Sequence, residues 1–354
     1  MLPPKGVRRL VLAPLVVVIA AALAALAPPL AVLSVAVSLI RWRTGRGNVK
    51  PKRMRALRLV SFALVWFLAE TAALTVFLCL WLVSGMGGRL STQPYQSRHY
   101  AVMRWYLGVI CTAARRTCGL RVEVEDPPDA DETAGRPLIV LSRHAGPGDS
   151  LLLVHHLLAA CQRRPRIVMK SSLQLDPSLD VAANRLPNAF VHRRQAGRSA
   201  ELIRRLAAGL DPRSALLLFP EGGNWTPLRW GRAIVRLRNQ GCDDLAERAV
   251  AMPRLLAPRV GGVAAAITAC PSADVIFVAH TGLDGMVTVR DVWRTLSADV
   301  TVRARWWRVP AAEVPRAAGR DAQVDWLYDW WQRLNAWIES ENAGSAEPSA
   351  TPRG

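Results

Sequence analysis

The sequence predicts an α/β domain, a sheet with helices packed against it, preceded by a membrane-anchoring N-terminal region. Two long apolar runs stand near the N-terminus, and helix-like and strand-like segments alternate from about residue 85 onward. A chain of 354 residues is also long enough for a large core. The expected boundaries are 1–84 for the hydrophobic region, 85–340 for the domain and 341–354 for a polar, disordered tail.

The two apolar runs carry the membrane prediction. Residues 11–40 have no charged side chain and residues 59–83 have only Glu70, and both runs exceed the roughly 20 residues that cross a bilayer. A secretory signal would have an apolar stretch of about 7–15 residues and a cleavage site, so a retained anchor fits better. Because Pro28-Pro29 interrupts the first run, a re-entrant hairpin and a single kinked helix both remain open.

Charge bears on partners and orientation. The formal net charge is +19, and the densest basic cluster lies between the two apolar runs, which favours membrane lipids over nucleic acid as partner. Basic residues flank the first run on both sides, so the positive-inside rule places both of its ends on the cytoplasmic side, which one simple crossing cannot satisfy. If the second run crosses fully, the residues after Val83 lie outside, and if it is an interfacial element, they stay inside. We expect a cell-membrane protein whose active site lies at the cytoplasmic face. Zinc-finger spacing, an aromatic ribonucleoprotein motif and a basic region with heptads are absent, and no nucleic-acid partner is expected.

The six cysteines are scattered, without a Cys-x2-Cys pair or the spacing of metal ligands. We therefore expect reduced, structural cysteines and no metal. This distribution favours a reducing compartment for the domain.

The elements of the domain follow from apolar runs, alternation and turn residues. Helices are expected at 98–117, 150–163, 197–209, 243–252, 260–268 and 323–339. Strands are expected at 120–124, 138–142, 165–170, 189–193, 215–219, 274–279 and 300–307, with a loop rich in proline and acidic residues over 126–135.

His144 and Asp149 are the candidate catalytic pair. They lie between the apolar run 137–141, which predicts a buried strand, and the run 151–158, which predicts a helix with Asp149 at its N-cap. A histidine with an ordinary pKa of about 6.5 accepts a proton at neutral pH, and a carboxylate fixes its tautomer. Such a pair suits deprotonation of an alcohol that attacks an activated acyl group. On its own, the spacing could also arise by chance around a structural histidine.

A second signal is the tetrapeptide Phe219-Pro220-Glu221-Gly222, which ends an expected strand in a sharp turn. A histidine and aspartate at this spacing, followed by this turn, resemble the glycerolipid acyltransferases, above all the lysophosphatidic acid acyltransferase family. The resemblance covers about residues 95–340 and implies a mixed sheet flanked by helices. It also implies transfer of a fatty acyl group from acyl-CoA or acyl carrier protein to the free hydroxyl of 1-acyl-sn-glycerol-3-phosphate, with no cofactor beyond the donor.

The resemblance also implies four substrate-binding residues. The segment ending in Lys170 is similar to a family strand that ends in lysine, and Phe190-Val191-His192-Arg193 is similar to a motif whose arginine is thought to hold the acceptor phosphate. An arginine suits this task because its planar fork binds phosphate through two hydrogen bonds. Arg193, helped by Lys170, would thus bind phosphate, while Glu221 and Gly222 would shape the acceptor end of the site.

Three positions depart from the family pattern. Arg143 replaces the usual asparagine, Gly223 replaces a threonine or serine, and Ala279-His280 stand where many members have proline. The sequence shows no carboxylate paired with His280, so a structural histidine is expected there. The departures leave open another acceptor, such as glycerol-3-phosphate, a different lysophospholipid or a glycolipid. A catalytically silent membrane protein that binds lipid or nucleic acid is the alternative from another functional class.

Overall fold

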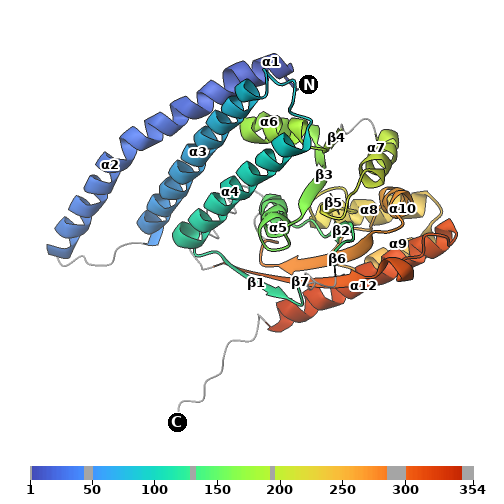
Figure 1. Cartoon of the computed structure of the whole chain (residues 1–354). Helices are drawn as coiled ribbons and strands as arrows, with labels where there is room; N and C mark the ends of the chain where they lie inside the picture. Colours follow the sequence, from blue (N-terminus) through green and yellow to red (C-terminus); the bar gives the residue numbers. More distant parts are fainter. Residues whose placement is uncertain (1, 44–50, 128–132, 192–195, 285–299, 345–354) are drawn as a thin grey trace, which may run out of the picture.

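The computed structural model describes residues 2–43, 51–127, 133–191, 196–284 and 300–344 (Figure 1). At its centre lies a seven-stranded sheet in the order β1-β7-β6-β2-β5-β3-β4. All neighbouring strands run parallel except β6 and β7, which are antiparallel. The predicted mixed α/β sheet flanked by helices is confirmed.

Each of the predicted strands is present, with ends shifted by at most two residues within the described segments. The strands are β1 Arg121–Glu125, β2 Leu138–Ser142, β3 Arg164–Lys170, β4 Ala189–Val191, β5 Ser214–Leu218, β6 Asp274–Thr281 and β7 Thr301–Val309. Every residue of β2, β5 and β6 is buried. Central strands covered on both faces consist of continuous apolar runs, which is why the sequence located these three so well.

Helices cover both faces of the sheet. Alternate side chains of β2 point to opposite faces, so Leu138 and Val140 belong to one apolar cluster and Ile139 and Leu141 to the other. The first cluster includes side chains of α4 Gln93–Cys118, α5 Pro147–Ala159 and α6 Pro177–Arg185. The second includes side chains of α7 Ala196–Ala208, α8 Pro227–Asn239, α9 Asp243–Val250, α10 Val260–Ala269 and α12 Arg320–Gly344. Two short 3-10 helices, η2 Ser171–Leu175 and η3 Ala311–Glu313, complete the domain.

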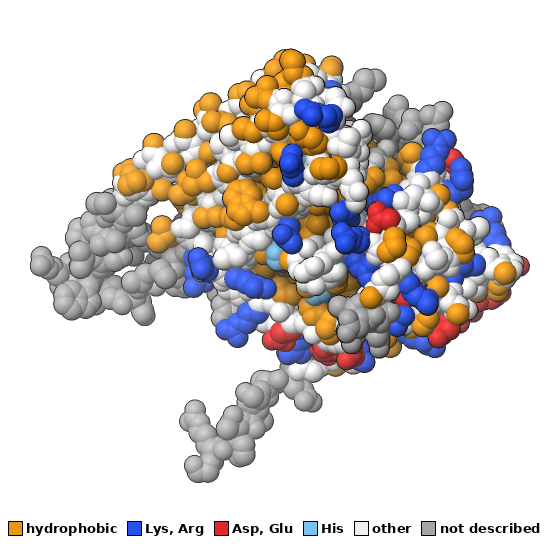
Figure 2. All heavy atoms as spheres, viewed as in Figure 1, with side chains coloured by type: hydrophobic (Ala, Val, Ile, Leu, Met, Phe, Trp, Pro, Cys, Tyr) orange, Lys and Arg blue, Asp and Glu red, His pale blue; other side chains and the backbone are white. Residues whose placement is uncertain are grey.

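The N-terminal region forms α1 Lys5–Val7, a π-helical segment η1 Arg8–Leu12, and the long helices α2 Ala13–Arg43 and α3 Pro51–Val83. Helix α2 continues through Pro28 and Pro29, so the re-entrant hairpin is not formed and the single-helix alternative holds. Two stretches, Lys5–Pro29 and Leu57–Val83, are long and apolar enough to cross a membrane by length and composition. Their outer surface is largely apolar (Figure 2).

Three differences from the sequence prediction concern helices. Helices α6 and α8 were not predicted, and α12 extends to Gly344, so the first four residues of the expected tail are helical. Residues 345–354 lie outside the described segments.

Candidate active site

The candidate site lies at the edge of the sheet where the carboxyl ends of β2, β5 and β6 meet. His144 follows β2, the turn Phe219–Gly222 follows β5, and His280 lies near the end of β6. These three strands are neighbours and parallel, so residues distant in the sequence converge there. In open α/β sheets, ligands bind at this edge.

His144 and Asp149 form a hydrogen-bonded pair. The Nδ1 atom of His144 lies 2.9 Å from Oδ2 and 3.1 Å from Oδ1 of Asp149. The Asp149 side chain is buried, whereas the His144 side chain is 15% exposed and its ring packs 4.6 Å from that of Phe219. Since Nδ1 faces the carboxylate, Nε2 is the ring nitrogen left for a substrate.

Asp149 is held by more than the histidine. Its Oδ2 accepts hydrogen bonds from the backbone N–H groups of Ala145 at 2.8 Å and Gly146 at 3.2 Å, and Oδ1 accepts one from Ser150 Oγ at 3.0 Å. Burial alone would raise the pKa of Asp149, but the hydrogen bonds and the neighbouring histidines outweigh burial and hold the pKa below its ordinary value. Asp149 is therefore an ionised carboxylate at neutral pH.

The position of Asp149 in its helix differs from the prediction. Helix α5 begins at Pro147 with Gly146 as N-cap, which makes Asp149 the third helical residue rather than the cap. Proline favours the first helical position because its fixed φ fits and its missing N–H would have no partner there. As a consequence, the Asp149 carboxylate reaches back over the loop and binds its N–H groups.

Glu221 binds the catalytic loop from the other side. Its Oε1 accepts from the backbone N–H of His144 at 3.0 Å, and its Oε2 accepts from the N–H of Leu256 at 3.1 Å. The residue is buried, with both oxygens directed at backbone groups. Burial raises the pKa of Glu221 to about 8, against the opposing effects of Arg143 and the two N–H donors. In this geometry Glu221 fixes the loop instead of lining an open acceptor site.

Gly222 completes the turn in a conformation that requires glycine. Its φ is +68°, and a Cβ atom would lie 2.8 Å from Cζ of Arg259, whose guanidinium packs across the turn. The turn is tied to the catalytic loop by a further hydrogen bond of 2.7 Å, from the Trp225 N–H to the His144 carbonyl. Any side chain at Gly222 would displace Arg259.

Of the other predicted residues, the structure describes Lys170 and does not bring it to the pair. Lys170 is exposed at the end of β3, which is separated from β2 by β5. Arg193 lies outside the described residues. Its predicted role in phosphate binding stays a prediction.

Two residues that the sequence left without a role lie beside Asp149. His280 is buried, with Nε2 3.6 Å from Oδ2 of Asp149, so the expectation of a histidine without a neighbouring carboxylate is wrong. Arg143 is fully buried, donates a hydrogen bond of 2.5 Å to the His280 carbonyl and forms an ion pair with Asp284. The signal available in the sequence was that β2 and β6 are both mainly apolar runs, and such strands lie at the centre of a sheet.

Comparison with known proteins gives the enzyme class. Residues 121–278, which contain both the dyad and the Phe-Pro-Glu-Gly turn, match the family model described as Acyltransferase. The predicted enzyme class, an acyltransferase, is thereby confirmed.

One solved structure similar to this acyltransferase is the crystal structure of the 1-acyl-sn-glycerophosphate (LPA) acyltransferase PlsC from Thermotoga maritima. The sequences are 14% identical, the TM-score is 0.43, and the match covers 79% of this chain and 99% of the other. A likeness at this level carries no weight for the acceptor. A search of curated proteins finds no match.

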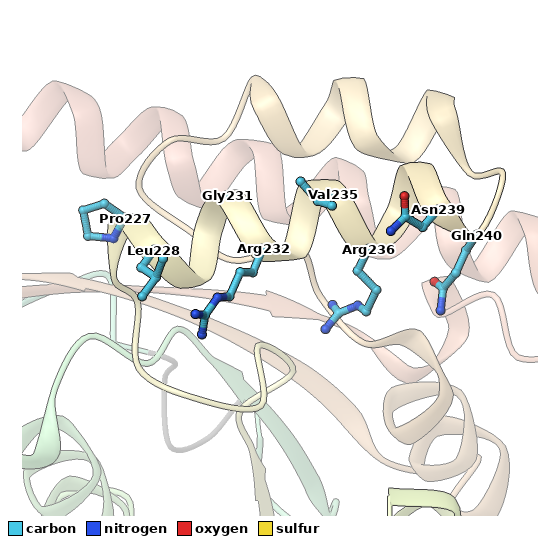
Figure 3. A pocket seen from close by; sticks show the side chains of 8 residues that line it. All are labelled: Pro227, Leu228, Gly231, Arg232, Val235, Arg236, Asn239 and Gln240. Carbon is cyan, nitrogen blue, oxygen red and sulfur yellow. The ribbon is translucent and has the colours of Figure 1, made fainter.

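Two hollows differ in their relation to the acyltransferase site. A small one of about 50 Å³ is bordered by Asp149, His156 and His280 and otherwise mainly by apolar side chains of β1, β6, β7 and α5. A larger one of about 680 Å³ runs along α8, with Arg232 and Arg236 side by side (Figure 3), and contains none of the candidate residues. The smaller hollow is the one next to the chemistry. Within the described residues, no group of three or more histidine, cysteine and acidic side chains is placed to hold a metal.

Proposed function

We propose that the chain transfers a fatty acyl group from acyl-CoA or acyl carrier protein to the free hydroxyl of 1-acyl-sn-glycerol-3-phosphate, giving phosphatidic acid. The observation that carries this proposal is the His144–Asp149 hydrogen bond at the mouth of the parallel strands of an acyltransferase domain. The serines that flank the pair are engaged elsewhere, since Ser142 donates to the Arg143 carbonyl and Ser150 to Asp149. The acceptor hydroxyl is then the attacking group.

In the proposed reaction, Asp149 fixes the tautomer with the proton on Nδ1 of His144, and Nε2 takes the proton of the acceptor hydroxyl. The hydroxyl oxygen attacks the thioester carbonyl and forms the new C–O bond. The C–S bond then breaks, and the imidazolium returns the proton to the departing thiolate. The proton balance closes within the dyad and the two substrates, so we propose no metal and no cofactor beyond the donor.

The acceptor end of the site is assigned from the resemblance. Arg193, with Lys170, is proposed to bind the acceptor phosphate, and the backbone of the Gly222 turn, which the buried Glu221 ties to the His144 loop, is proposed to define the wall nearest His144. Arg259, whose guanidinium lies over Gly222, adds a positive charge at that wall. Because arginine binds phosphate well, this charge supports a phosphate-bearing acceptor over a glycolipid.

We also propose that the hydrophobic region attaches the enzyme to the cell membrane with the active site on its cytoplasmic side. Exposed apolar side chains on α2, η1 and α3 support attachment, among them Leu10, Val18, Leu26 and Leu78. The basic residues before the first run support the orientation, because two helices that both cross return the chain to the side of the membrane on which it starts. A lipid acceptor would then reach the site from the bilayer to which the helices bind.

The test is acyl transfer by the full chain in detergent or nanodiscs. Acyl-CoA and acyl carrier protein would be supplied with lysophosphatidic acid, glycerol-3-phosphate, other lysophospholipids and a glycolipid. Turnover should be highest with lysophosphatidic acid, and His144→Ala should lower kcat on the order of 10²- to 10⁴-fold because the general base is lost. His155→Ala, on α5 outside the dyad, is the matched control and should keep wild-type turnover. Equal rates for His144→Ala and wild type would refute the catalytic assignment, and a preference for another acceptor would refute the assigned substrate.

A further inference from the structure

We propose that His280 is a positioning residue of the acyl-transfer centre, a second histidine that faces the same carboxylate oxygen of Asp149 as His144 does. The inference rests on the proposed function, because it assigns His280 to a reaction in which Asp149 orients the base. His280 occupies one of the positions at which the chain departs from the family pattern.

The geometry of Asp149 is shared between the two rings. Oδ2 lies 2.9 Å from Nδ1 of His144 and 3.6 Å from Nε2 of His280. The first distance is a hydrogen bond, and the second is a contact that a small shift of either side chain would shorten into one. Because the acidic side chain sits between two imidazoles, its orientation responds to both.

The His280 ring has no other role among the described residues. It is buried, and neither ring nitrogen makes a hydrogen bond in the described part of the chain. A buried polar atom without a partner costs free energy that an apolar side chain would avoid. The adjoining hollow is lined mainly by apolar residues, including Leu153, Val278 and Trp306, so a leucine would suit this position for packing alone.

The charges around His280 keep its ring neutral. Burial and the nearby Arg143 guanidinium lower the pKa of His280 to about 4, against the opposing pull of Asp149 and Asp284. Arg143 also fixes the backbone by donating to the His280 carbonyl, and His156 borders the same hollow from α5. A neutral ring has one N–H group, and on Nε2 that group points its positive end toward Asp149.

The consequence concerns the orientation of His144. The Asp149 carboxylate fixes the His144 ring through Nδ1, so a rotation of the carboxylate would turn Nε2 away from the acceptor hydroxyl. The N–H dipole of His280 holds the same carboxylate from a second direction. His280 thereby helps to keep the dyad in the geometry needed for proton transfer.

The experiment compares His280→Leu with His280→Gln in the full-length protein. His280→Leu should lower kcat about tenfold, the size of one hydrogen bond to a charged group, with KM for donor and acceptor unchanged. The melting temperature should stay equal or increase, since the apolar side chain fills a dry site. His280→Gln, which keeps an N–H donor, should recover most of the lost turnover.

His99→Leu is the matched control, because His99 is equally buried but fully engaged. Its Nδ1 lies 2.7 Å from the Tyr95 carbonyl and its Nε2 lies 3.2 Å from Arg185. This variant should lose thermal stability and keep its kcat, the reverse of His280→Leu. A wild-type kcat in His280→Leu would overturn the proposal, as would a kcat loss that follows a lowered melting temperature and is not recovered by glutamine.

Two further measurements separate this inference from the proposed function. In an Asp149→Asn background, His280→Leu should change kcat no further, because its effect passes through the carboxylate; a full additional loss would overturn the proposal. The NMR resonance of the His144 Nδ1–H, which is hydrogen-bonded to Asp149, should shift in His280→Leu whatever the acceptor is, because the carboxylate is reoriented. An unchanged resonance would overturn the inference about His280 even if acyl transfer is found, whereas a shifted resonance in a protein without transfer would remove only the proposed function.

Discussion

Asp149 in the first turn of α5 and Asp180 in α6 are both buried aspartates with two basic neighbours, but their roles differ. Asp180 pairs with the guanidinium groups of Arg8 at 2.7 Å and Arg9 at 3.0 Å, a side-chain type that does not transfer protons. Asp149 pairs with the imidazole of His144, the side-chain type most used for proton transfer, and lies beside the neutral ring of His280. A permanent pair fixes structure, whereas a titratable partner allows proton transfer.

The permanent contacts join the hydrophobic region to the domain. Besides the Asp180 pairs, Glu70 in α3 accepts a hydrogen bond of 2.6 Å from the Tyr106 hydroxyl and one of 2.8 Å from the Ser178 N–H. The single acidic residue of the second apolar run is thus used inside the protein. Helices η1 and α3 are therefore bonded to α4 and α6, and their apolar surface has a fixed place relative to the catalytic edge of the sheet.

Asp149→Asn should give the largest effect, because it replaces the anion and leaves the fold intact. The amide cannot accept hydrogen bonds from Ala145 and His144 as the carboxylate does, and the tautomer of His144 is no longer fixed. We expect kcat to fall on the order of 10³-fold or more with a small change in melting temperature. Measuring kcat and the melting temperature of the variant and the wild type in the same detergent would check both expectations. A melting temperature that drops sharply while residual kcat stays high would show that Asp149 is structural, like Asp180.

Asp180→Asn should show the opposite profile. Removing the charge leaves Arg8 and Arg9 facing a neutral amide at a site where the carboxylate is 1% exposed, so we expect a loss of about 3 kcal/mol in the free energy of unfolding. Turnover per folded molecule should be retained. Chemical denaturation combined with an activity assay would measure the two quantities.

Glu201→Gln provides the matched control for Asp180→Asn. Glu201 also bonds two arginines, Arg204 and Arg205, both at 2.7 Å, but on the exposed surface of α7. Solvent screens such pairs, and we expect no measurable shift of the denaturation midpoint. Equal effects at Asp180 and Glu201 would contradict the view that burial gives the Asp180 pair its structural weight.

The parts of the fold that the sequence could predict are those that depend on local patterns of residues. The strands β2, β5 and β6 are continuous apolar runs, and their residues alone located them. Helices α6 and α8 were missed although each begins with a capping residue followed by proline. Asp176 accepts from the Leu179 N–H at 2.8 Å, and Thr226 accepts from the Arg229 N–H at 3.2 Å. These signals are local and could have been used.

In the candidate site, contacts between residues close in the sequence could be predicted, and contacts between distant residues could not. His144 and Asp149 are five residues apart, so one turn brings them together and the spacing was informative. Arg143 contacts His280 across 137 residues, and Glu221 contacts the His144 backbone across 77. Such contacts depend on which strands are neighbours in the sheet, and a single sequence does not specify that order. The local dyad was therefore predictable, and the residues that hold it were not.

Glu221→Gln should lower turnover less than Asp149→Asn does and should cost no more stability than Asp180→Asn does. Glutamine keeps one oxygen acceptor but turns an NH2 group toward the N–H of either His144 or Leu256. We expect a loss of about 1–3 kcal/mol in stability and a decrease in kcat of a few fold, because the loop backbone relaxes.

The variant should also change how stability depends on pH. The pKa of Glu221 is about 8 in the folded protein against an ordinary value of 4.5, so within this interval the folded state keeps a proton that the unfolded chain has released. Stability contributed by this group is thus present at low pH and is lost as pH rises toward 8. Burial and Glu70 raise the pKa of Asp176 to about 7, so Asp176 also makes stability fall with pH, but only up to about pH 7. Burial lowers the pKa of His280 to about 4, so His280 changes stability only under more acidic conditions.

Between pH 7 and 8 the unfolding midpoint of the wild type should therefore fall with pH, and the unfolding midpoint of Glu221→Gln should change less. Arg204 and Arg205 lower the pKa of the wild-type Glu201 carboxylate to about 2, far below this pH range. Glu201→Gln should therefore keep the wild-type dependence of the unfolding midpoint on pH. Parallel pH dependences for wild type and Glu221→Gln would mean that Glu221 is already ionised at neutral pH. The His144 loop would then be held by two charged carboxylates, those of Glu221 and Asp149.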